Sequence, residues 1–201
     1  VARLLSRMYC ALGVLSKGHL VEVDRSGMVA GYMGQTALKT KKVIDKAKGG
    51  VLFIDEAYAL SNHGPEGDFG QEAIDTLNKA MEDYRDDLIV IVAGYPDLME
   101  DFIDANPGLR SRFNKTIEFP DYTEEDLFTI FEHMCREQDY HLSSSGKVRL
   151  KEVLGKMVKE KDENFGNARD VRNYLSRVIE RQANRLVAAA SVNKEQLLEI
   201  T

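Results

Sequence analysis

Two short apolar runs, separated by a helical stripe, constrain the fold of this chain most strongly. Val51–Ile54 ("VLFI") and Leu88–Val92 ("LIVIV") carry no polar residue on either face. Between them, "FGQEAIDTLNKAMEDY" repeats apolar residues every three or four positions, as the packed face of a helix does. Strands that are apolar on both faces are typical of parallel sheets covered by helices. The sequence therefore predicts an α/β domain.

Two adjacent carboxylates, Asp55 and Glu56, directly follow the first of these runs. Ligands of α/β sheets bind in the crevice at the carboxyl ends of the strands, so a pair of charges at this point indicates a site. A strand that simply ends at a solvated turn is the alternative. This stretch alone does not separate the two interpretations.

The remaining elements of the first half alternate in the same way. "GHLVEVD" predicts a strand, a helix is expected near Ala37–Ala47, and "NKTIEFPD" predicts a further short strand that Pro120 closes. The first dozen residues predict a helix that stops at Gly13. Its apolar face consists of Val1, Leu4, Leu5, Met8 and Leu12.

After Pro120 the pattern is helical and shows no convincing sheet strand. Thr123, followed by three acidic residues, is a typical helix start, and two further helices are expected near 144–161 and 168–190. We therefore expect an N-terminally incomplete α/β domain at 1–120 and a smaller helical domain at 121–201.

Composition narrows the function classes. The 201 residues carry a formal net charge of -6, which disfavours a dedicated nucleic-acid binder, since such proteins normally show a basic face. The longest apolar run, "LIVIVAG", is too short to span a bilayer. Cys10 and Cys135 lie far apart and the four histidines show no metal-ligand spacing. These features predict a cytoplasmic protein without a structural metal and without a membrane partner.

Several motifs occur in the order found in AAA+ ATPases. "VLFIDEAYAL" resembles a Walker B strand, "NPGLRSRF" an arginine-finger segment and "GNARDVRN" the start of a sensor-2 helix. Essentially the whole chain is similar to the group of red-type Rubisco activases and stage V sporulation protein K, as "KGHLVEVDRSGMVAGYMGQT" and "IVIVAGYPDLMEDF" illustrate. The resemblance implies a P-loop-type parallel sheet flanked by helices and followed by a small all-α lid.

The same resemblance implies a function. The implied protein is a ring-forming motor, hexameric in the intact parent, that uses ATP and Mg²⁺. Such a motor threads or remodels a protein substrate, for example Rubisco or a sporulation-related protein. Asp55 would orient the water shell of the metal, and Glu56 would polarise the water that attacks the γ-phosphate. Arg112 and Arg110 are the candidates that reach the phosphate of a neighbouring subunit. Arg112 is the first choice because it directly precedes the phenylalanine of the motif.

Two further positions follow from the resemblance. Arg169 would place a cation of the helical domain over the nucleotide; an ordinary ion pair with Asp170 or Glu163 is the alternative. Tyr32, Met33 and Gly34 in "AGYMGQT" resemble the pore loop of ring translocases, with a buried tyrosine closing a turn as the alternative. The segment 61–70 is either a second pore-facing loop or an ordinary connection.

The sequence departs from the family pattern at two places. Gly94 stands where AAA+ proteins commonly have the sensor-1 asparagine, and Tyr95 follows it, so the residue that orients the water stays open between them. The phosphate loop GxxxxGKS or GxxxxGKT does not occur, and the resemblance places it just ahead of Val1.

The absence of the phosphate loop leads to further expectations. Alone, this chain should bind ATP weakly and hydrolyse it negligibly, and the strands "LIVIVAG" and "TIEF" should border a gap. The gap would make the chain marginally stable, or it would be closed by strand exchange, by direct pairing of its two edges or by a segment supplied in trans. A non-hydrolysing scaffold that donates Arg112 to a partner is the alternative function. A DNA-associated AAA+ protein is a third interpretation, which the acidic charge disfavours.

Overall fold

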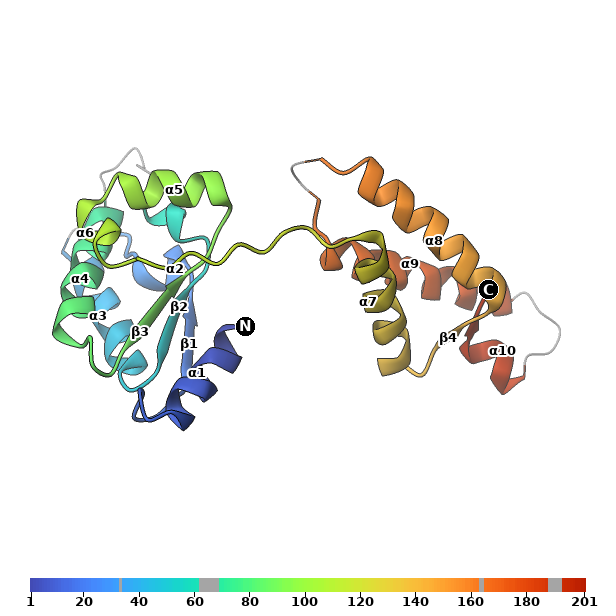
Figure 1. The fold of residues 1–201 in the computed structure, drawn as a ribbon, viewed down its shortest axis with the longest axis horizontal. Coiled ribbons are helices and arrows are strands. Elements are labelled where there is room, and N and C mark those ends of the chain that lie inside the picture. Colours follow the sequence, from blue (N-terminus) through green and yellow to red (C-terminus); the bar gives the residue numbers. More distant parts are fainter. Residues whose placement is uncertain (33, 62–68, 163–164, 188–192) are drawn as a thin grey trace. The chain divides into compact units, whose positions relative to one another are not determined.

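The computed structural model describes residues 1–32, 34–61, 69–162, 165–187 and 193–201 (Figure 1). The chain divides into two compact units, Val1–Glu118 and Phe119–Thr201. None of the described helices combines the length and the apolar character that crossing a membrane requires.

The first unit contains a parallel sheet in the order β1-β2-β3. The strands are β1 (Leu20–Val23), β2 (Val51–Ile54) and β3 (Ile89–Val92), and each confirms a predicted strand. In β2, Val51, Leu52 and Ile54 are fully buried, whereas β1 and β3 are mostly half-buried. The central strand that leads to Asp55 and Glu56 is thus the part of the sheet that water reaches least.

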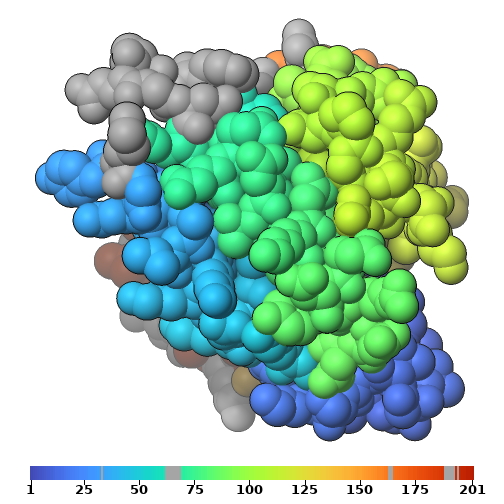
Figure 2. Space-filling model, turned by 90° about the vertical axis from the view of Figure 1, so that its left-hand side faces the viewer, coloured from blue at the N-terminus to red at the C-terminus, as the bar shows by residue number. Residues whose placement is uncertain are grey.

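Helices connect the strands and supply the core. α2 (Arg25–Met28) and α3 (Thr36–Ala47) lead from β1 to β2; the 3-10 turn η1 (Ala57–Ser61) and α4 (Phe69–Asp83) lead from β2 to β3. α3 and α4 pack against each other on one side of the sheet, and Figures 1 and 2 show them side by side. α5 (Pro96–Asp104) and α6 (Pro107–Arg110) follow β3. The fully buried side chains of this core include Met28, Ile44, Leu52, Ile54, Ile74, Leu77 and Leu109.

The first helix forms as predicted, but its apolar face is not covered. In α1 (Ala2–Ala11) and its flanks, Val1, Leu4, Met8 and Leu12 are all exposed. Ser6 is the buried residue of the helix, and its hydroxyl donates to the carbonyl of Arg3. α1 contacts β1 and β2 and therefore packs through the side of Ser6.

The strand predicted in "NKTIEFPD" is wrong. Residues 113–120 form no strand, and Ile117 and Phe119 are 66% and 70% exposed. A strand requires a neighbour that pairs with its N–H and C=O groups, and among the described residues this segment has none. No described strand pairs with the outer edge of β3 either, so the two edges do not pair with each other.

The second unit is helical, as predicted. α7 (Glu124–Glu137), α8 (Ser144–Lys159), α9 (Ala168–Val187) and α10 (Lys194–Leu198) carry it. Its core contains Leu127, Phe131, Cys135, Leu150, Leu154, Val171 and Leu175. The predicted start at Thr123 is confirmed, since its hydroxyl accepts the N–H of Asp126 in a capping box. The sequence analysis missed a parallel pair of short strands, β4 (His141–Leu142) and β5 (Glu199–Ile200), which ties the chain end to the start of α8.

Candidate functional site

Asp55 and Glu56 follow β2 in a turn that is fixed on both sides. The N–H of Asp55 donates to the carbonyl of Val23 at 2.9 Å, and the N–H of Ala57 donates to the carbonyl of Ala93 at 3.0 Å. Between these anchors Glu56 has φ = +48°, a conformation that costs a non-glycine residue about 1–2 kcal/mol. Both acidic residues are exposed. The sheet therefore holds two carboxylates in place at its carboxyl edge.

The two carboxylates line a groove of about 480 Å³. Its other walls come from α2, from the segment after α2 and from η1, and consist of Asp24, Arg25, Ser26, Val29, Ala30, Gly31 and Ala59. Asp24 caps α2, and hydrogen bonds from the Ser26 hydroxyl and the Gly27 N–H lower the pKa of its carboxyl group. The groove is thus bordered by three carboxylates at the carboxyl ends of β1 and β2.

Arg25 is the cation among the residues that line this groove, and its guanidinium binds backbone carbonyls of its own unit. Nη1 of Arg25 donates to the carbonyl of Ala59 at 2.6 Å and to the carbonyl of Leu60 at 3.2 Å. It thereby ties α2 to η1, the turn that directly follows Glu56. The sequence analysis did not select Arg25.

The donor set fits Mg²⁺ bound together with phosphates. The described residues contain no group of three or more His, Cys, Asp or Glu side chains that could enclose a metal ion. Mg²⁺ in phosphate-transfer sites keeps several waters and takes only one or two protein carboxylates. Asp55, exposed at the end of a rigid strand, meets that requirement.

Gly94 and Tyr95 lie next to Tyr58, a residue that the sequence analysis missed. The rings of Tyr58 and Tyr95 are 6.4 Å apart, and a Cβ on Gly94 would lie 2.7 Å from the ring of Tyr58. Burial raises the pKa of Tyr58, and the neighbouring charge of Glu56 raises it further. Tyr58 therefore lies next to both Gly94 and Glu56. Its place two residues after Glu56, in "DEAY", was the available signal.

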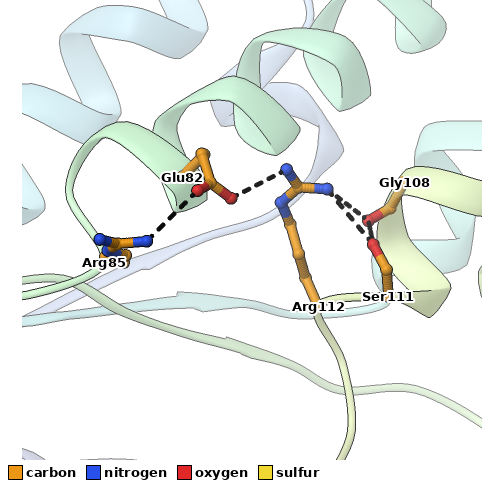
Figure 3. Close-up of polar contacts among 5 residues, drawn as sticks. All are labelled: Glu82, Arg85, Gly108, Ser111 and Arg112. Atoms are coloured by element: carbon orange, nitrogen blue, oxygen red, sulfur yellow. Dashed lines mark hydrogen bonds and ion pairs between the residues drawn. The ribbon is translucent and has the colours of Figure 1, made fainter.

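Arg110 and Arg112 both pair with carboxylates of their own unit. Figure 3 shows the contacts of Arg112. The side chain of Arg112 is 30% exposed, and its Nη2 donates to Glu82 at 3.2 Å. The side chain of Arg110 is 70% exposed, and its Nη1 pairs with Asp104 at 2.9 Å. Glu82 comes from α4, far away in the sequence, and the sequence analysis did not select it.

The segment after α2 presents Tyr32 to solvent. Tyr32 is 75% exposed, so the alternative of a buried tyrosine is wrong. Gly34 has φ = +75°, a value that favours glycine, and Met33 lies outside the described residues. Most of the proposed second loop, 62–68, also lies outside them.

Arg169 lies in the first turn of α9, in the second unit, and is exposed. The carboxylate of Asp170 accepts the N–H of Gly166 at 2.9 Å, and the described residues show no ion pair between Arg169 and Asp170. Glu163, the other candidate partner, lies outside the described residues. Arg169 therefore has no described acidic partner within its unit.

The fold is a parallel sheet flanked by helices, followed by a helical unit, with two carboxylates at the carboxyl edge of the sheet. Residues 2–121 match the model of the ATPase family associated with various cellular activities (AAA), and residues 123–201 match the AAA lid domain. The chain belongs to the AAA ATPase family.

Relatives within this family are similar over nearly the whole chain. Protein CbbX of Cereibacter sphaeroides is 49% identical over 95% of this chain and 61% of its own length. Stage V sporulation protein K of Bacillus subtilis is 45% identical over 100% of this chain and 62% of its own length. The chloroplastic ribulose bisphosphate carboxylase/oxygenase activase of Cyanidioschyzon merolae is 47% identical over 94% of this chain and 64% of its own length. The chain thus spans a little under two thirds of the length of these relatives, and the resemblance drawn from its motifs is confirmed.

A solved structure supports the fold independently. RuvB of Thermotoga maritima superposes with a TM-score of 0.60 at 19% sequence identity, covering 98% of this chain and 57% of RuvB. At this identity the likeness concerns the fold alone. The expected AAA+ architecture, a helix-flanked parallel sheet followed by a lid, is confirmed.

Proposed function

We propose that this chain is the ATPase core of a ring-forming motor that uses ATP hydrolysis to remodel a protein substrate. The observation that carries the proposal is the placement of Asp55 and Glu56. Both follow the buried central strand, are anchored to the strands on either side and open into the groove. Phosphoryl transfer needs such rigid positioning more than covalent chemistry.

Each site residue has a role in this proposal. Asp55 orients the water shell of Mg²⁺, which would supply charge neutralisation at the phosphates. Glu56 accepts the proton of the attacking water, and its carboxylate lines the groove. Tyr58 lies next to Glu56, and Gly94 leaves the space that the ring of Tyr58 occupies.

The cations come from outside this set. Arg112, or Arg110 in its place, reaches the nucleotide of a neighbouring subunit in a hexameric ring, where a guanidinium suits the charge that spreads over the phosphate oxygens. Arg169 brings a further cation from the lid. Hydrolysis would then depend on assembly.

Tyr32 is the proposed contact with the protein substrate. An exposed aromatic ring grips many side chains without reading their sequence. The names of the relatives offer two candidates for that substrate, Rubisco and a protein of sporulation.

The test is ATP turnover by the complete gene product, including whatever sequence precedes Val1. Glu56→Gln keeps the shape of the side chain and removes the proton acceptor, so we expect turnover to fall by about 10²- to 10⁴-fold. Glu100→Gln, an exposed position on α5, is the matched control and should leave turnover unchanged. Residues 1–201 alone should hydrolyse ATP negligibly, because they contain no phosphate loop.

The outcome separates the motor from the scaffold. A complete gene product without ATP turnover, or with turnover that Glu56→Gln leaves intact, would contradict the proposal and favour a non-hydrolysing module. Substrate remodelling is tested separately by Tyr32→Ala. We expect this change to abolish remodelling and to leave ATP turnover in place; unchanged remodelling would remove the gripping role.

A further inference from the structure

Glu82, near the end of α4, contacts two arginines at the same time (Figure 3). Its Oε2 accepts from Nη2 of Arg112 at 3.2 Å, and its Oε1 lies 3.6 Å from Nη1 of Arg85. One carboxylate is thus shared by two guanidinium groups, of which only Arg112 belongs to the arginine-finger segment.

Most of the donors of Arg112 are already used inside its own unit. Nη1 donates to the carbonyl of Gly108 at 3.0 Å and to the hydroxyl of Ser111 at 3.4 Å, and Nη2 donates to Glu82. Nε of Arg112 is buried and has no hydrogen-bond partner among the described residues. A buried donor without an acceptor is unfavourable, so this arrangement is not the best that the guanidinium can reach.

The exposure of Glu82 and Arg85 makes the contact with Arg112, which is itself 30% exposed, exchangeable. The side chain of Glu82 is 59% exposed and that of Arg85 is 71% exposed. Ion pairs at such exposure are weak and break readily. If Arg112 swings away, Glu82 remains next to Arg85, so its charge keeps a partner.

A carboxylate and a phosphate compete for the same arms of a guanidinium, because both accept from the Nη1 and Nη2 fork. While Glu82 accepts from Nη2, the arm of Arg112 that carries Nη2 is occupied by a negatively charged partner. An approaching phosphate must displace that carboxylate before it can bind both arms.

We propose that Glu82 is a positioning residue that retains Arg112 on its own subunit and releases it to the phosphate of a neighbouring subunit, while Arg85 compensates the charge of Glu82 after release. This inference rests on the proposed function, in which Arg112 acts in trans. Glu82 touches neither nucleotide nor substrate; it sets how often Arg112 is free.

The test is steady-state ATP turnover by variants of the complete gene product. Glu82→Gln keeps the shape and removes the charge, so kcat should rise by about 1.5- to 5-fold, the range that corresponds to an exposed ion pair, with KM for ATP unchanged. Arg85→Ala should have the opposite effect, because Glu82 is then left with Arg112 alone. The double variant should behave like Glu82→Gln.

Asp83→Asn is the matched control. Asp83 neighbours Glu82 on α4, is also exposed and lies outside the described contacts of Arg112. It should leave kcat unchanged. Thermal unfolding of each variant separates retention from stability, since a purely structural role of Glu82 would move the unfolding midpoint and not kcat. If Glu82→Gln fails to fold, Glu82→Asp, which withdraws the carboxylate by one methylene, should give a smaller rise.

The results separate the two proposals. Suppose that Glu56→Gln and Arg112→Ala both lose turnover, while Glu82→Gln leaves it unchanged or lowers it. That result would overturn the role of Glu82 and leave the proposed function intact. Turnover that survives Glu56→Gln and Arg112→Ala defeats the proposed function itself. A rise in Glu82→Gln, with a fall in Arg85→Ala, supports the retention of Arg112.

Discussion

Gly94 lies so close to Tyr58 that a Cβ on Gly94 would come within 2.7 Å of Cδ1 of the Tyr58 ring. The sulfur of Met99 would lie 2.8 Å from the same Cβ. The absence of a side chain at residue 94 is therefore what allows Tyr58 to occupy its place next to Glu56. Any larger side chain at residue 94, asparagine included, would require Tyr58 or Met99 to shift.

We expect Gly94→Ala to destabilise the first unit by about 1–3 kcal/mol, the usual range for overpacking a filled site. Urea unfolding followed by circular dichroism measures the effect. Gly31→Ala is the matched control, since a Cβ on Gly31 meets nothing within 4 Å, and it should change stability by less than about 0.5 kcal/mol. Equal stability of the two variants would contradict the close contact.

The proposed action of Arg112 in trans predicts complementation between two inactive variants. Glu56→Gln retains Arg112, and Arg112→Ala retains Glu56, so neither should turn over ATP alone. In randomly mixed rings about a quarter of the sites combine an intact Glu56 with an intact neighbouring Arg112, and turnover should recover to about that level. ATP turnover against mixing ratio is the measurement. A mixture as inactive as its components would speak against a finger in trans.

Arg110→Ala discriminates between the two arginines. Its guanidinium is 70% exposed and pairs with Asp104 alone among the described residues, so we expect it to change turnover far less than Arg112→Ala does. Loss of an arginine finger reduces turnover by about 10³- to 10⁵-fold. A loss of that size in Arg110→Ala, with Arg112→Ala mildly affected, would reverse the assignment.

Local patterns predicted most of this fold because each is recorded within a few residues. The apolar runs that became β2 and β3, the helix at Thr36–Ala47 and the cap at Thr123 all follow from neighbours in the sequence. The predictions that failed depend on other elements that pair with or cover the segment. Whether "TIEF" becomes a strand depends on a neighbouring strand, and whether the stripe of α1 is buried depends on what covers it.

The same distinction between local and distant information applies to the residues of the candidate site. Asp55 and Glu56 could be selected because they directly follow a buried run. Glu82 could not, since its importance comes from its contact with Arg112, which lies 30 residues away along the chain. Tyr58 had a local signal in its place two residues after Glu56, but its contact with Gly94, 36 residues away, had none. Residue type alone does not report such contacts.

The capping box of α7 predicts an acid-sensitive lid unit. Hydrogen bonds from the hydroxyl and the N–H of Thr123 lower the pKa of Asp126 below its ordinary value of 3.8. The stabilisation is therefore complete above that value and is lost as pH falls below it, through the lower pKa of the folded state. In Asp126→Asn, unfolding of the second unit should depend less steeply on pH as the pH falls below about 4.

Glu125→Gln is the matched control for this prediction. It removes the same charge from the same first turn without touching the capping hydrogen bonds, which Thr123 and Asp126 form with each other. Thr123→Ala should destabilise the unit by about 0.5–2 kcal/mol at neutral pH. Urea titrations at several pH values, followed by signals from residues 119–201, test both predictions. Equal pH dependence in Asp126→Asn and Glu125→Gln would exclude the capping carboxylate as the cause.

Cys135 offers a reporter of opening in the second unit. It is 1% exposed among Leu127, Phe131 and Leu150, and burial raises the pKa of its thiol to about 11. Only about one thiol in a thousand is then ionised at pH 8, and the reagent cannot reach it while the core is closed. Cys10, in contrast, is partly exposed. Treatment with iodoacetamide at pH 8 should therefore modify Cys10 first, and Cys135 only when the unit opens.

Phe131→Ala links this reactivity to packing. Removing a fully buried phenylalanine costs about 3–5 kcal/mol, which raises the population of the open unit and should accelerate modification of Cys135 while that of Cys10 stays constant. Phe128→Ala, at a half-buried position on the same helix, should have a smaller effect. Mass spectrometry of the modified peptides gives both rates in one sample. Because Cys10 and Cys135 lie in different units, modification of both at one common rate in the native protein would mean that Cys135 is not enclosed by its core.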